Sequence, residues 1–383
     1  MNLIEFGTIS HIKKGKKPLR QVDKPQDGYM PYVDIEAFET GNIKMYTDGE
    51  KCLPCKAGDI LIVCDGSRSG FVGKAIDGYV GSTLAIISAD GMSQEYLYYF
   101  LQGKYALLNT KKKGTGTPHL DANILNQQKL VVPSIEEQKR IVARIEELFS
   151  ELDNGVETLK KTKQQLAVYR QAVLKEAFDH ISSVSDTRLT KDVCNDIKVG
   201  IVIKPAQYYT SEEEGIKAFR SANVREFHIN NTDWVYLSKE GHSCNMRSEI
   251  HTGDVLIVRS GYPGTSCVVT DEYTGCNAID ILIAVPNTDI ITPEYLCAFT
   301  NSPYGRKLVS EKKRGVAQAH LNVGGYSQMK IPVPDISIQH QVVEQIEANL
   351  SRCVNIEKTV DTALQQAEAM RQSILKKAFE GEL

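Results

Sequence analysis

The chain contains an internal repeat, and this feature limits its architecture more than any other. Residues 119–178 align without a gap onto residues 320–379, with 22 identical residues in 60 positions. Further towards the N-terminus the register slips by short insertions, yet Gly58–Val63 still matches Gly253–Val258. A repeat at this spacing indicates one structural unit that occurs twice. The back portions of the two units are similar, whereas the front portions diverge.

The front portion of each unit predicts a mixed domain. Apolar runs such as Ile60–Val63 and Leu84–Ile87 are short, rich in β-branched residues and bounded by glycine, which is typical of buried strands. A helix is expected near Gln94–Leu108. The second copy has the same order, with strands at Val255–Val258 and Ile281–Val285 and a helix from about Pro293.

The back portion of each unit predicts one long helix. Ser134 is expected as an N-cap with Glu137 completing a capping box, and Asp335 is expected as the N-cap of the second helix. A helix over 135–178 would be ~66 Å long. Apolar residues then follow at steps of three and four, and the pairing positions are Ile141, Ile145, Leu152, Val156, Leu159, Leu166, Val173, Val342, Ile346, Leu350, Leu364, Met370 and Ile374.

A narrow apolar stripe of this length needs a partner helix, and the other copy is the obvious one. The sequence therefore predicts an α+β fold in which two similar mixed α/β domains are separated by two long helices that pair as an antiparallel coiled coil, with pseudo-twofold symmetry. The expected segments are 1–133, 134–180, 181–332 and 333–383. Two unrelated bundle helices are the alternative.

Composition excludes some classes of protein. No run of 18 apolar residues is present, and the N-terminal residues lack the apolar region of a secretory signal. Nine cysteines are scattered along the chain, which favours free thiols in a reducing cytoplasm. The formal net charge of −3 does not by itself indicate a nucleic-acid partner. Binding to DNA would have to come from local basic patches.

Several motifs that suggest chemistry are incomplete. The stretch 66–75 is not a phosphate loop, because Arg68 and Ala75 stand where a Walker motif needs glycine and serine or threonine. Cys52 and Cys55 have metal or redox spacing, but no second pair follows. Neither an Asn-Pro-Pro-aromatic tetrapeptide nor the acidic signature of a nuclease is present. We therefore expect no catalytic residues, no metal site and no cofactor in this chain.

The junctions between front and back portions resemble those of type I restriction–modification specificity subunits. The first junction carries Gly114–Leu120, Lys129–Pro133 and Glu137–Val142, and the second carries weaker matches at 319–321, 330–334 and 339–342. The stretch 200–209 also looks like the start of one target-recognition subfamily.

The resemblance implies a cytoplasmic subunit that reads a bipartite site in double-stranded DNA, with one target-recognition domain for each half-site. Its helices would dock two methyltransferase subunits and, through them, the restriction and motor subunits. S-adenosylmethionine, ATP and Mg²⁺ would then belong to those partners.

Basic and polar residues near glycine are the candidates for DNA contact, because their side chains can reach phosphates without a clash. Arg68 and Arg259, which each follow a Gly-Asp-aliphatic strand, are the candidates for reading guanine. The complete set is Lys13, Lys14, Lys16, Lys17, Ser67, Arg68, Lys111, Lys112, Lys113, Thr115, Thr117, Lys198, Lys204, Arg259, Ser260, Tyr262, Lys312, Lys313, Arg314 and Gln318.

Other interpretations stay open at this point. The charged loops could be solvated surface, and His119 and His320 could be strand-end histidines with satisfied hydrogen bonds. The whole chain could be a coiled-coil adaptor that never contacts DNA, or an enzyme with an unrecognised active site.

Overall fold

The computed structural model describes residues 3–113, 118–311 and 320–383, without the side chains of 180 and 182–184. The chain divides into two compact units. One unit consists of residues 1–159 and 361–383, and the other of residues 160–360. The first unit therefore contains both ends of the chain, whereas the second is a continuous segment.

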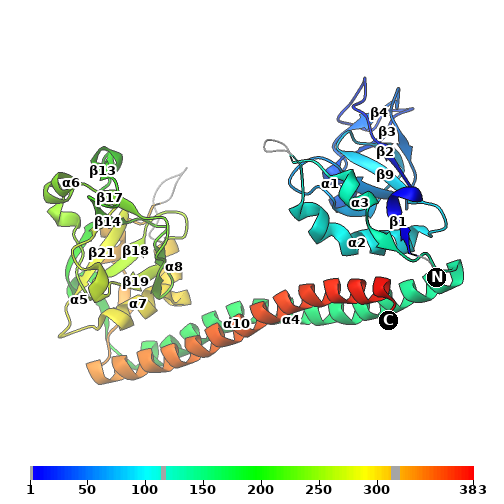
Figure 1. The fold of residues 1–383 in the computed structure, drawn as a ribbon. Coiled ribbons are helices and arrows are strands. Elements are labelled where there is room, and N and C mark those ends of the chain that lie inside the picture. Colours follow the sequence, from blue (N-terminus) through cyan, green and yellow to red (C-terminus); the bar gives the residue numbers. More distant parts are fainter. Residues whose placement is uncertain (1–2, 114–117, 312–319) are drawn as a thin grey trace. The chain divides into compact units, whose positions relative to one another are not determined.

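Two four-stranded sheets form the body of the first unit (Figure 1). One is antiparallel, in the order β2 (Ser10–Lys14), β9 (Leu84–Ala89), β6 (Ile60–Val63) and β7 (Val72–Lys74). The other has the order β4 (Tyr46–Thr47), β3 (Met30–Val33), β8 (Gly78–Val80) and β5 (Pro54–Cys55). The remaining elements are β1 (Ile4–Glu5) paired with β10 (Lys129–Leu130), η1 (Phe6–Thr8), α1 (Ile35–Thr40), α2 (Gln94–Thr110) and α3 (Ala122–Asn126).

Strand β6 explains why its sequence is an uninterrupted apolar run. Successive side chains of a strand point to opposite faces. Ile60 and Ile62 lie in the core that includes α2, whereas Leu61 and Val63 lie in a second core with Val80 of the other sheet. All four residues of the strand are buried. The apolar run is therefore the signature of a strand that is covered on both faces.

The second unit has the same plan. Its antiparallel sheet has the order β12 (Cys194–Val199), β21 (Ile281–Pro286), β18 (Val255–Val258) and β19 (Ser266–Val268). The other sheet has the order β13 (Tyr209–Thr210), β17 (Val235–Leu237), β14 (Ile216–Phe219) and β20 (Asn277–Ala278). Two further pairs are β11 (Thr187–Leu189) with β22 (Lys330–Pro332), and β15 (Val224–Arg225) with β16 (His228–Ile229).

The shorter helices of the second unit are α5 (Thr190–Val193), η2 (Pro205–Tyr208), α6 (Lys239–Cys244), η3 (Met246–Ser248), η4 (Asp271–Tyr273), α7 (Pro293–Asn301), α8 (Pro303–Glu311) and α9 (Val323–Ser327). Helices α7 and α8 correspond to the single helix α2 of the first unit. The sequence predicts one helix here, but Pro303 lacks an N–H to donate and disfavours a helical conformation of the preceding Ser302. The helix therefore ends at Asn301 and restarts.

The repeat extends into the front portions, where the sequences diverge. Both units have one parallel strand pair at the same place, β3 with β8 and β14 with β20. Both also need a glycine after the first long strand. A Cβ atom would lie 2.3 Å from the carbonyl oxygen of Gly81 if added at Gly15, and 2.2 Å from that of Ala278 if added at Gly200. Only glycine fits so close to another backbone.

The predicted long helices are α4 (Ile135–Val184) and α10 (Ile336–Glu380). Helix α4 begins as expected, with the Glu137 amide donating to the Ser134 hydroxyl at 3.3 Å. Asp335 precedes α10, and its carbonyl accepts from Gln339 at 3.0 Å. Helix α4 continues past residue 180, because no glycine or proline follows Phe178 until after the helix has ended.

In the first unit the two helices pack against each other in opposite chain directions. Ile145 and Phe149 of α4 share an apolar cluster with Leu375 and Ala378 of α10. One turn further along α4, Asp153 forms an ion pair with Arg371 of α10. The Arg371 guanidinium also lies 4.5 Å from the centre of the Phe149 ring.

In the second unit the other halves of the same helices pair in the same way. Arg170 of α4 forms an ion pair with Glu357 of α10, with 2.6 Å between nitrogen and oxygen. Leu174 and Phe178 share a core with Val342 and Ile346. The antiparallel pairing is confirmed in each unit, and the alternative of two unrelated helices is wrong. Arg170 and Arg371 occupy equivalent positions of the repeat, and each contacts an acidic residue of the other helix.

Most predicted pairing positions lie on the covered face. Ile145, Leu166, Val173, Val342 and Ile346 are buried, and Ile141, Leu152, Val156, Leu159, Leu350, Leu364 and Ile374 are half-buried. Met370 differs, because its side chain is 54% exposed. From Ala367 the covered positions continue in steps of four through Arg371 to Leu375, so Met370 falls outside the stripe.

Two equivalent glutamines fix the start of each long helix to its domain. The Gln138 side chain accepts from Ser93 N at 2.8 Å and donates to the carbonyls of Gly91 at 2.6 Å and Pro133 at 3.0 Å. The Gln339 side chain accepts from Thr292 N and donates to the carbonyls of Ile290 and Pro334, at 2.8–2.9 Å. Both glutamines are fully buried, and both bind the N-cap residue of the neighbouring helix, α2 or α7.

Candidate nucleic-acid interface

Most of the predicted DNA-contact residues that the structure describes lie near one edge of each antiparallel sheet. This edge is the one formed by the ends of the strands, not by an outermost strand. Since neighbouring strands run in opposite directions, the ends of β2 and β6 lie beside the starts of β9 and β7. The loops at this edge carry Lys16, Lys17, Ser67 and Arg68, and all four side chains are exposed. The ends of β12 and β18 form the equivalent edge of the second unit.

In the first unit, Asp65 joins two strand ends to a later segment. Lys14 Nζ lies 2.8 Å from one carboxylate oxygen of Asp65, and His119 Nδ1 lies 2.7 Å from the other. Burial raises the pKa of Asp65, but the hydrogen bonds from Lys14 and His119 outweigh it and hold the pKa below its usual value. Lys14 is therefore partly engaged within the protein, whereas Lys13 is exposed on the same strand.

The lysines at the end of α2 have different environments. Lys112 Nζ donates to the carbonyl of Ser67 at 3.0 Å, and Lys113 Nζ lies 3.0 Å from an Asp121 oxygen. Lys111 is exposed. Asn109 also donates to the Ser67 carbonyl, at 2.9 Å. The loop that follows β6 is thus fixed by α2, and Lys112 and Lys113 both have partners within the protein.

Arg68 and Arg259 are not structurally equivalent. Arg68 lies at the surface, paired with Glu39 and 4.7 Å above the Phe71 ring, with its side chain 46% exposed. Arg259 is 15% exposed, and it contacts Asp280 at 2.7 Å and the carbonyl of Leu321 at 3.1 Å. The sequence interpretation treated them as counterparts, but Arg259 directly follows its strand and therefore joins the strand end to neighbouring turns.

The two histidines do occupy equivalent places. His320 Nδ1 lies 2.5 Å from the Ser260 hydroxyl, just as His119 contacts Asp65. Ser260 and Asp65 each lie two residues beyond the corresponding strand. Both histidines therefore have a hydrogen-bond partner inside the protein, as the strand-end interpretation expects.

The other candidates of the second unit are distributed around the same edge. Lys198 is half-buried on β12 and donates to the carbonyl of Glu249 at 3.1 Å. Lys204 is exposed, with a left-handed φ of 45°. Tyr262 is 83% exposed in the loop between β18 and β19. Thr115, Thr117, Lys312, Lys313, Arg314 and Gln318 lie outside the described residues.

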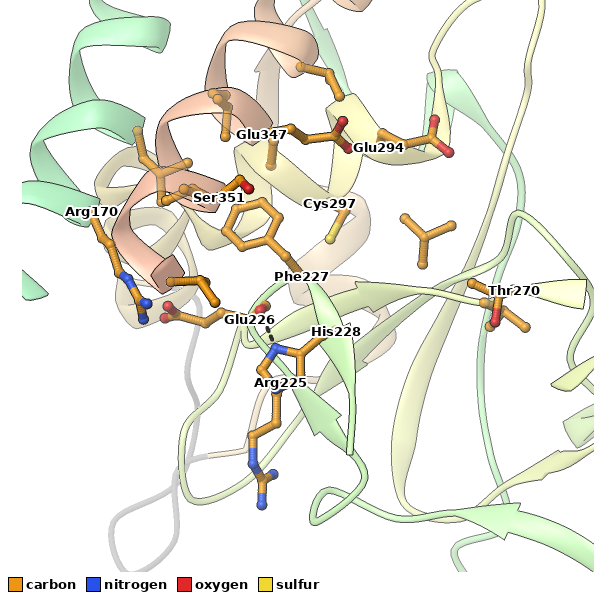
Figure 2. A pocket seen from close by; sticks show the side chains of 18 of the residues that line it. Arg170, Arg225, Glu226, Phe227, His228, Thr270, Glu294, Cys297, Glu347 and Ser351 are labelled. Carbon is orange, nitrogen blue, oxygen red and sulfur yellow. Dashed lines mark hydrogen bonds between the residues drawn. The ribbon is translucent and has the colours of Figure 1, made fainter. Parts of the chain in front are cut away.

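A crevice of about 1070 Å³ lies in the second unit between the domain body and the long helices (Figure 2). Arg170 of α4 and Glu347 and Ser351 of α10 line one side, and the turn at Glu226–Phe227 lines the other. The lining also includes apolar side chains of α10 such as Val354, which is 55% exposed. This is an open surface of mixed character beside the paired helices.

Sequence reasoning missed several residues that organise these surfaces. Gln138 and Gln339 were noted only as part of a motif, and Arg170 and Arg371 were not singled out. The available signal was the repeat itself, since the members of each pair are 201 residues apart and identical.

Two further observations concern only the part of the chain that the structure describes. There, no cluster of three or more His, Cys, Asp or Glu side chains is arranged to hold a metal ion. Among the described helices, none is long and apolar enough to span a membrane.

Burial raises the pKa of the Cys55 thiol to about 11, so this member of the Cys52–Cys55 pair is a poor nucleophile.

Comparison with known proteins shows what this chain is similar to. Residues 1–168 match the family described as type I restriction modification DNA specificity domain. The EcoBI type I specificity subunit of Escherichia coli is 24% identical over 99% of this chain and 85% of its own length. The MjaVIII specificity subunit of Methanocaldococcus jannaschii is 23% identical over 97% of this chain and 91% of its own length.

Solved structures show the same fold. A chain from a type I R-M system structure covers 100% of this chain and 98% of its own length, with a TM-score of 0.75 and 20% identity. The match to the HsdS subunit from Thermoanaerobacter tengcongensis covers 100% of this chain and 97% of that subunit, with a TM-score of 0.55 and 19% identity. The predicted fold class and the resemblance drawn from the sequence are confirmed.

Proposed function

We propose that this chain, which is related along nearly its whole length to type I restriction–modification specificity subunits, is the DNA-reading subunit of such a system. The observation that carries the proposal is the duplicated sheet edge. Each unit has a loop after its Gly-Asp-aliphatic strand, β6 or β18, and basic residues flank this loop. The loop has the same position in the same arrangement of strands in both units. One domain would read each half of a bipartite site in double-stranded DNA.

The two domains would read different base sequences. Their frames match, but the exposed side chains at the two edges differ, with Arg68 in the first loop and Tyr262 in the second. Lys16, Lys17 and Lys111 in the first domain and Lys204 in the second would contact phosphates, which position a protein on DNA without specifying sequence. We propose that the other DNA-contact residues predicted from the sequence also lie against the DNA.

The paired helices would serve the assembly. We expect them to dock two methyltransferase subunits, and through these the restriction and motor subunits. The crevice beside α4 and α10 offers mixed apolar and charged surface for such contacts. In this arrangement the chain has no catalytic role, and S-adenosylmethionine, ATP and Mg²⁺ are bound by the partners in the cytoplasm.

The decisive experiment is a map of methylated adenines in cells that express the chain with a cognate methyltransferase subunit. We expect methylation at a bipartite site whose two halves differ and are separated by unread base pairs. Methylation at one uninterrupted site would contradict the reading of one half-site by each domain.

Two simpler measurements address the alternatives. Phosphate contacts predict that binding to DNA falls steeply between about 50 and 200 mM salt. A chain that shows no salt-dependent gel shift, alone or with its methyltransferase, would be an adaptor. The purified chain with S-adenosylmethionine and DNA should transfer no methyl group, and transfer would indicate an enzyme.

A further inference from the structure

The loop between β18 and β19 in the second unit holds one aromatic side chain out from the domain. Tyr262 is 83% exposed at its tip. Gly261 and Gly264 flank the tip region with left-handed φ angles of 78° and 89°. The Thr265 amide and hydroxyl both donate to the carbonyl of Tyr262, at 3.2 and 2.9 Å. The backbone of this loop is therefore tightly folded although its aromatic side chain is open to solvent.

Arg306 of helix α8 holds this loop from beneath. Its Nη1 donates to the carbonyl of Pro263 and to the Thr265 hydroxyl, both at 3.0 Å. Helix and loop approach closely, since a Cβ added at Gly264 would lie 3.1 Å from a methyl group of Val309. One guanidinium nitrogen thus binds the loop on the C-terminal side of Tyr262.

The other end of the Arg306 fork is bound inside the domain. Nη2 lies 2.8 Å from Glu226 and 3.2 Å from the side-chain oxygen of Asn301. Asn301 is fully buried and exchanges two hydrogen bonds with the backbone of Ser266, at 2.9 and 3.1 Å. The Arg306 side chain is 24% exposed, and its charge is balanced by Glu226. A planar fork with several donors can satisfy these acceptors together, whereas a lysine cannot.

A groove of about 900 Å³ lies next to Tyr262. Its lining includes Ser260, Gly261 and Tyr262 of the loop, and Ser221, Ala222 and Arg225 from the segment that leads into and includes β15. Arg225 is exposed, and Figure 2 shows its guanidinium pointing away from α4 and α10, while Phe227 points toward them. The lining of the groove therefore includes an exposed aromatic ring, Tyr262, and an exposed cation, Arg225.

The first unit arranges the same residue types in reverse. There the arginine, Arg68, is on the loop, where it stacks on Phe71 and pairs with Glu39. The aromatic residue is on the helix, where Tyr105 of α2 contacts Phe71 with ring centres 5.5 Å apart. In each unit an arginine, its acidic partner and a tyrosine thus lie at the loop and the elements packed against it, but the first loop exposes the cation and the second exposes the aromatic ring.

From this geometry we infer that Tyr262 reads bases of the second half-site and that Arg306 is the positioning residue that aims it. The groove between Tyr262 and Arg225 takes one DNA strand, with Arg225 against a phosphate. Tyr262 can pack on a thymine methyl group or donate its hydroxyl to a base edge. This inference rests on the proposed function, and it names the residues that make the second half-site different from the first.

The test uses the assembled complex of full-length chain and methyltransferase, with relative methylation rates on a library of second half-site variants. Tyr262→Ala should reduce discrimination at one or two base positions by about tenfold, within the range for removal of a base contact. R306K should reduce it at the same positions. The double variant should lose no more than either single variant, because Arg306 acts through the loop. Arg188→Lys, at an exposed position of β11, is the matched control and should change nothing.

The first half-site is an internal readout. A general loss of folding lowers methylation at all sites alike, whereas a positioning role changes only the second half-site. If R306K melts early, Thr265→Val removes one acceptor of Arg306 together with the hydrogen bond from the Thr265 hydroxyl to the Tyr262 carbonyl, and leaves the Glu226 ion pair intact, so it should still relax the same positions. Arg225→Ala should weaken binding to all sequences and reduce the salt slope by about one.

Unchanged second half-site selectivity in both Tyr262→Ala and Thr265→Val would overturn the inference while leaving the proposed function standing. A wild-type complex that methylates no bipartite site would contradict the proposed function, and the inference would fall with it.

Discussion

The two sheet edges show which parts of the repeat are kept and which vary. Gly15 and Gly200, His119 and His320, and the parallel strand pairs have the same places in both units. The exposed side chains do not, since Arg68 lies on the first loop where the second loop has Tyr262. Residues that hold the backbone are thus retained, while those that face outward differ. Two copies of one frame can in this way read two different sequences.

The largest expected effect comes from removing one of the two copies altogether. A fragment of residues 1–183 has one domain and one long helix, and its apolar stripe would be covered by a second copy, antiparallel. The structure supplies the contact, because Arg371 pairs with Asp153 and Arg170 is its equivalent in the repeat. Arg170 of one copy should therefore pair with Asp153 of the other. We expect a dimer in solution and, with the methyltransferase, methylation at a palindromic site.

Charge reversal sharpens this prediction. Arg170→Asp would place like charges together twice in the fragment dimer but would disturb only one of the two pairs in the full chain. The fragment should dissociate more readily, as seen by its mass at several concentrations. A wild-type fragment that is folded and monomeric at tens of micromolar would count against helix pairing of this kind.

The next effect tests whether the two domains are attached to their helices equally. Gln138→Ala and Gln339→Ala each leave one buried N–H and two carbonyls without their side-chain partner. Each unsatisfied group costs about 1–3 kcal/mol, so both variants should lose a few kcal/mol of stability. Thermal unfolding measures this loss, and exposed Gln365→Ala on α10 is the control. A large difference between the two variants would mean that the units are not anchored alike.

A smaller effect separates the two arginines that sequence reasoning treated as counterparts. Arg68→Ala should relax recognition of the first half-site by about 1–3 kcal/mol, the range for removal of a guanine contact, and should also lower the melting temperature, because the mostly buried Glu39 loses its partner. Arg259→Ala should impair the second half-site only, and should also lower stability because Asp280 and the Leu321 carbonyl lose their partner. Methylation maps and melting curves of both variants distinguish the two outcomes. Equal selectivity in Arg68→Ala would remove that residue from base reading.

The smallest effect concerns the lysines expected to bind phosphates. Replacing exposed Lys16 and Lys17 with alanine should weaken binding to all sequences and reduce the salt slope by about 0.9 for each phosphate that is no longer neutralised. Base selectivity should not change. Lys376 and Lys377 are a second exposed lysine pair, on α10, and their replacement should leave the slope unchanged. A slope that responds only to the α10 pair would mean that DNA lies elsewhere.

Much of the fold could be predicted because each helix and strand pattern of the repeat occurs twice in the sequence. The central strands, the long helices and their antiparallel pairing follow from apolar periodicity seen twice. The sequence predicts Met370 on the stripe because it lies three residues after Ala367, but the covered positions continue from Ala367 in steps of four. Local periodicity does not determine which of two neighbouring faces is covered.

The surface loops were harder to predict because their contacts come from distant parts of the chain. Arg259 is held by Asp280 and Leu321, and the Tyr262 loop is held by Arg306. Counted from the end of the strand, Arg68 is the fifth residue after Val63 whereas Arg259 is the first after Val258, so the two arginines do not occupy the same position in their loops. Spacing in sequence locates the loop, whereas side-chain direction depends on which residues the fold brings beneath it.

The discontinuity of the first unit has a consequence for how the protein is made. Residues 160–360 form the second unit without a break, so this unit is complete in sequence before residues 361–383 are synthesised. The first unit lacks residues 361–383 until the whole second unit has been synthesised, although Phe379 packs on Tyr96 and Phe100, with ring centres 5.0 and 5.5 Å away. Domains generally form in the order of synthesis. Here the domain that is translated first is the one whose core is closed last, and loss of the final helical turns would harm the beginning of the chain before its end.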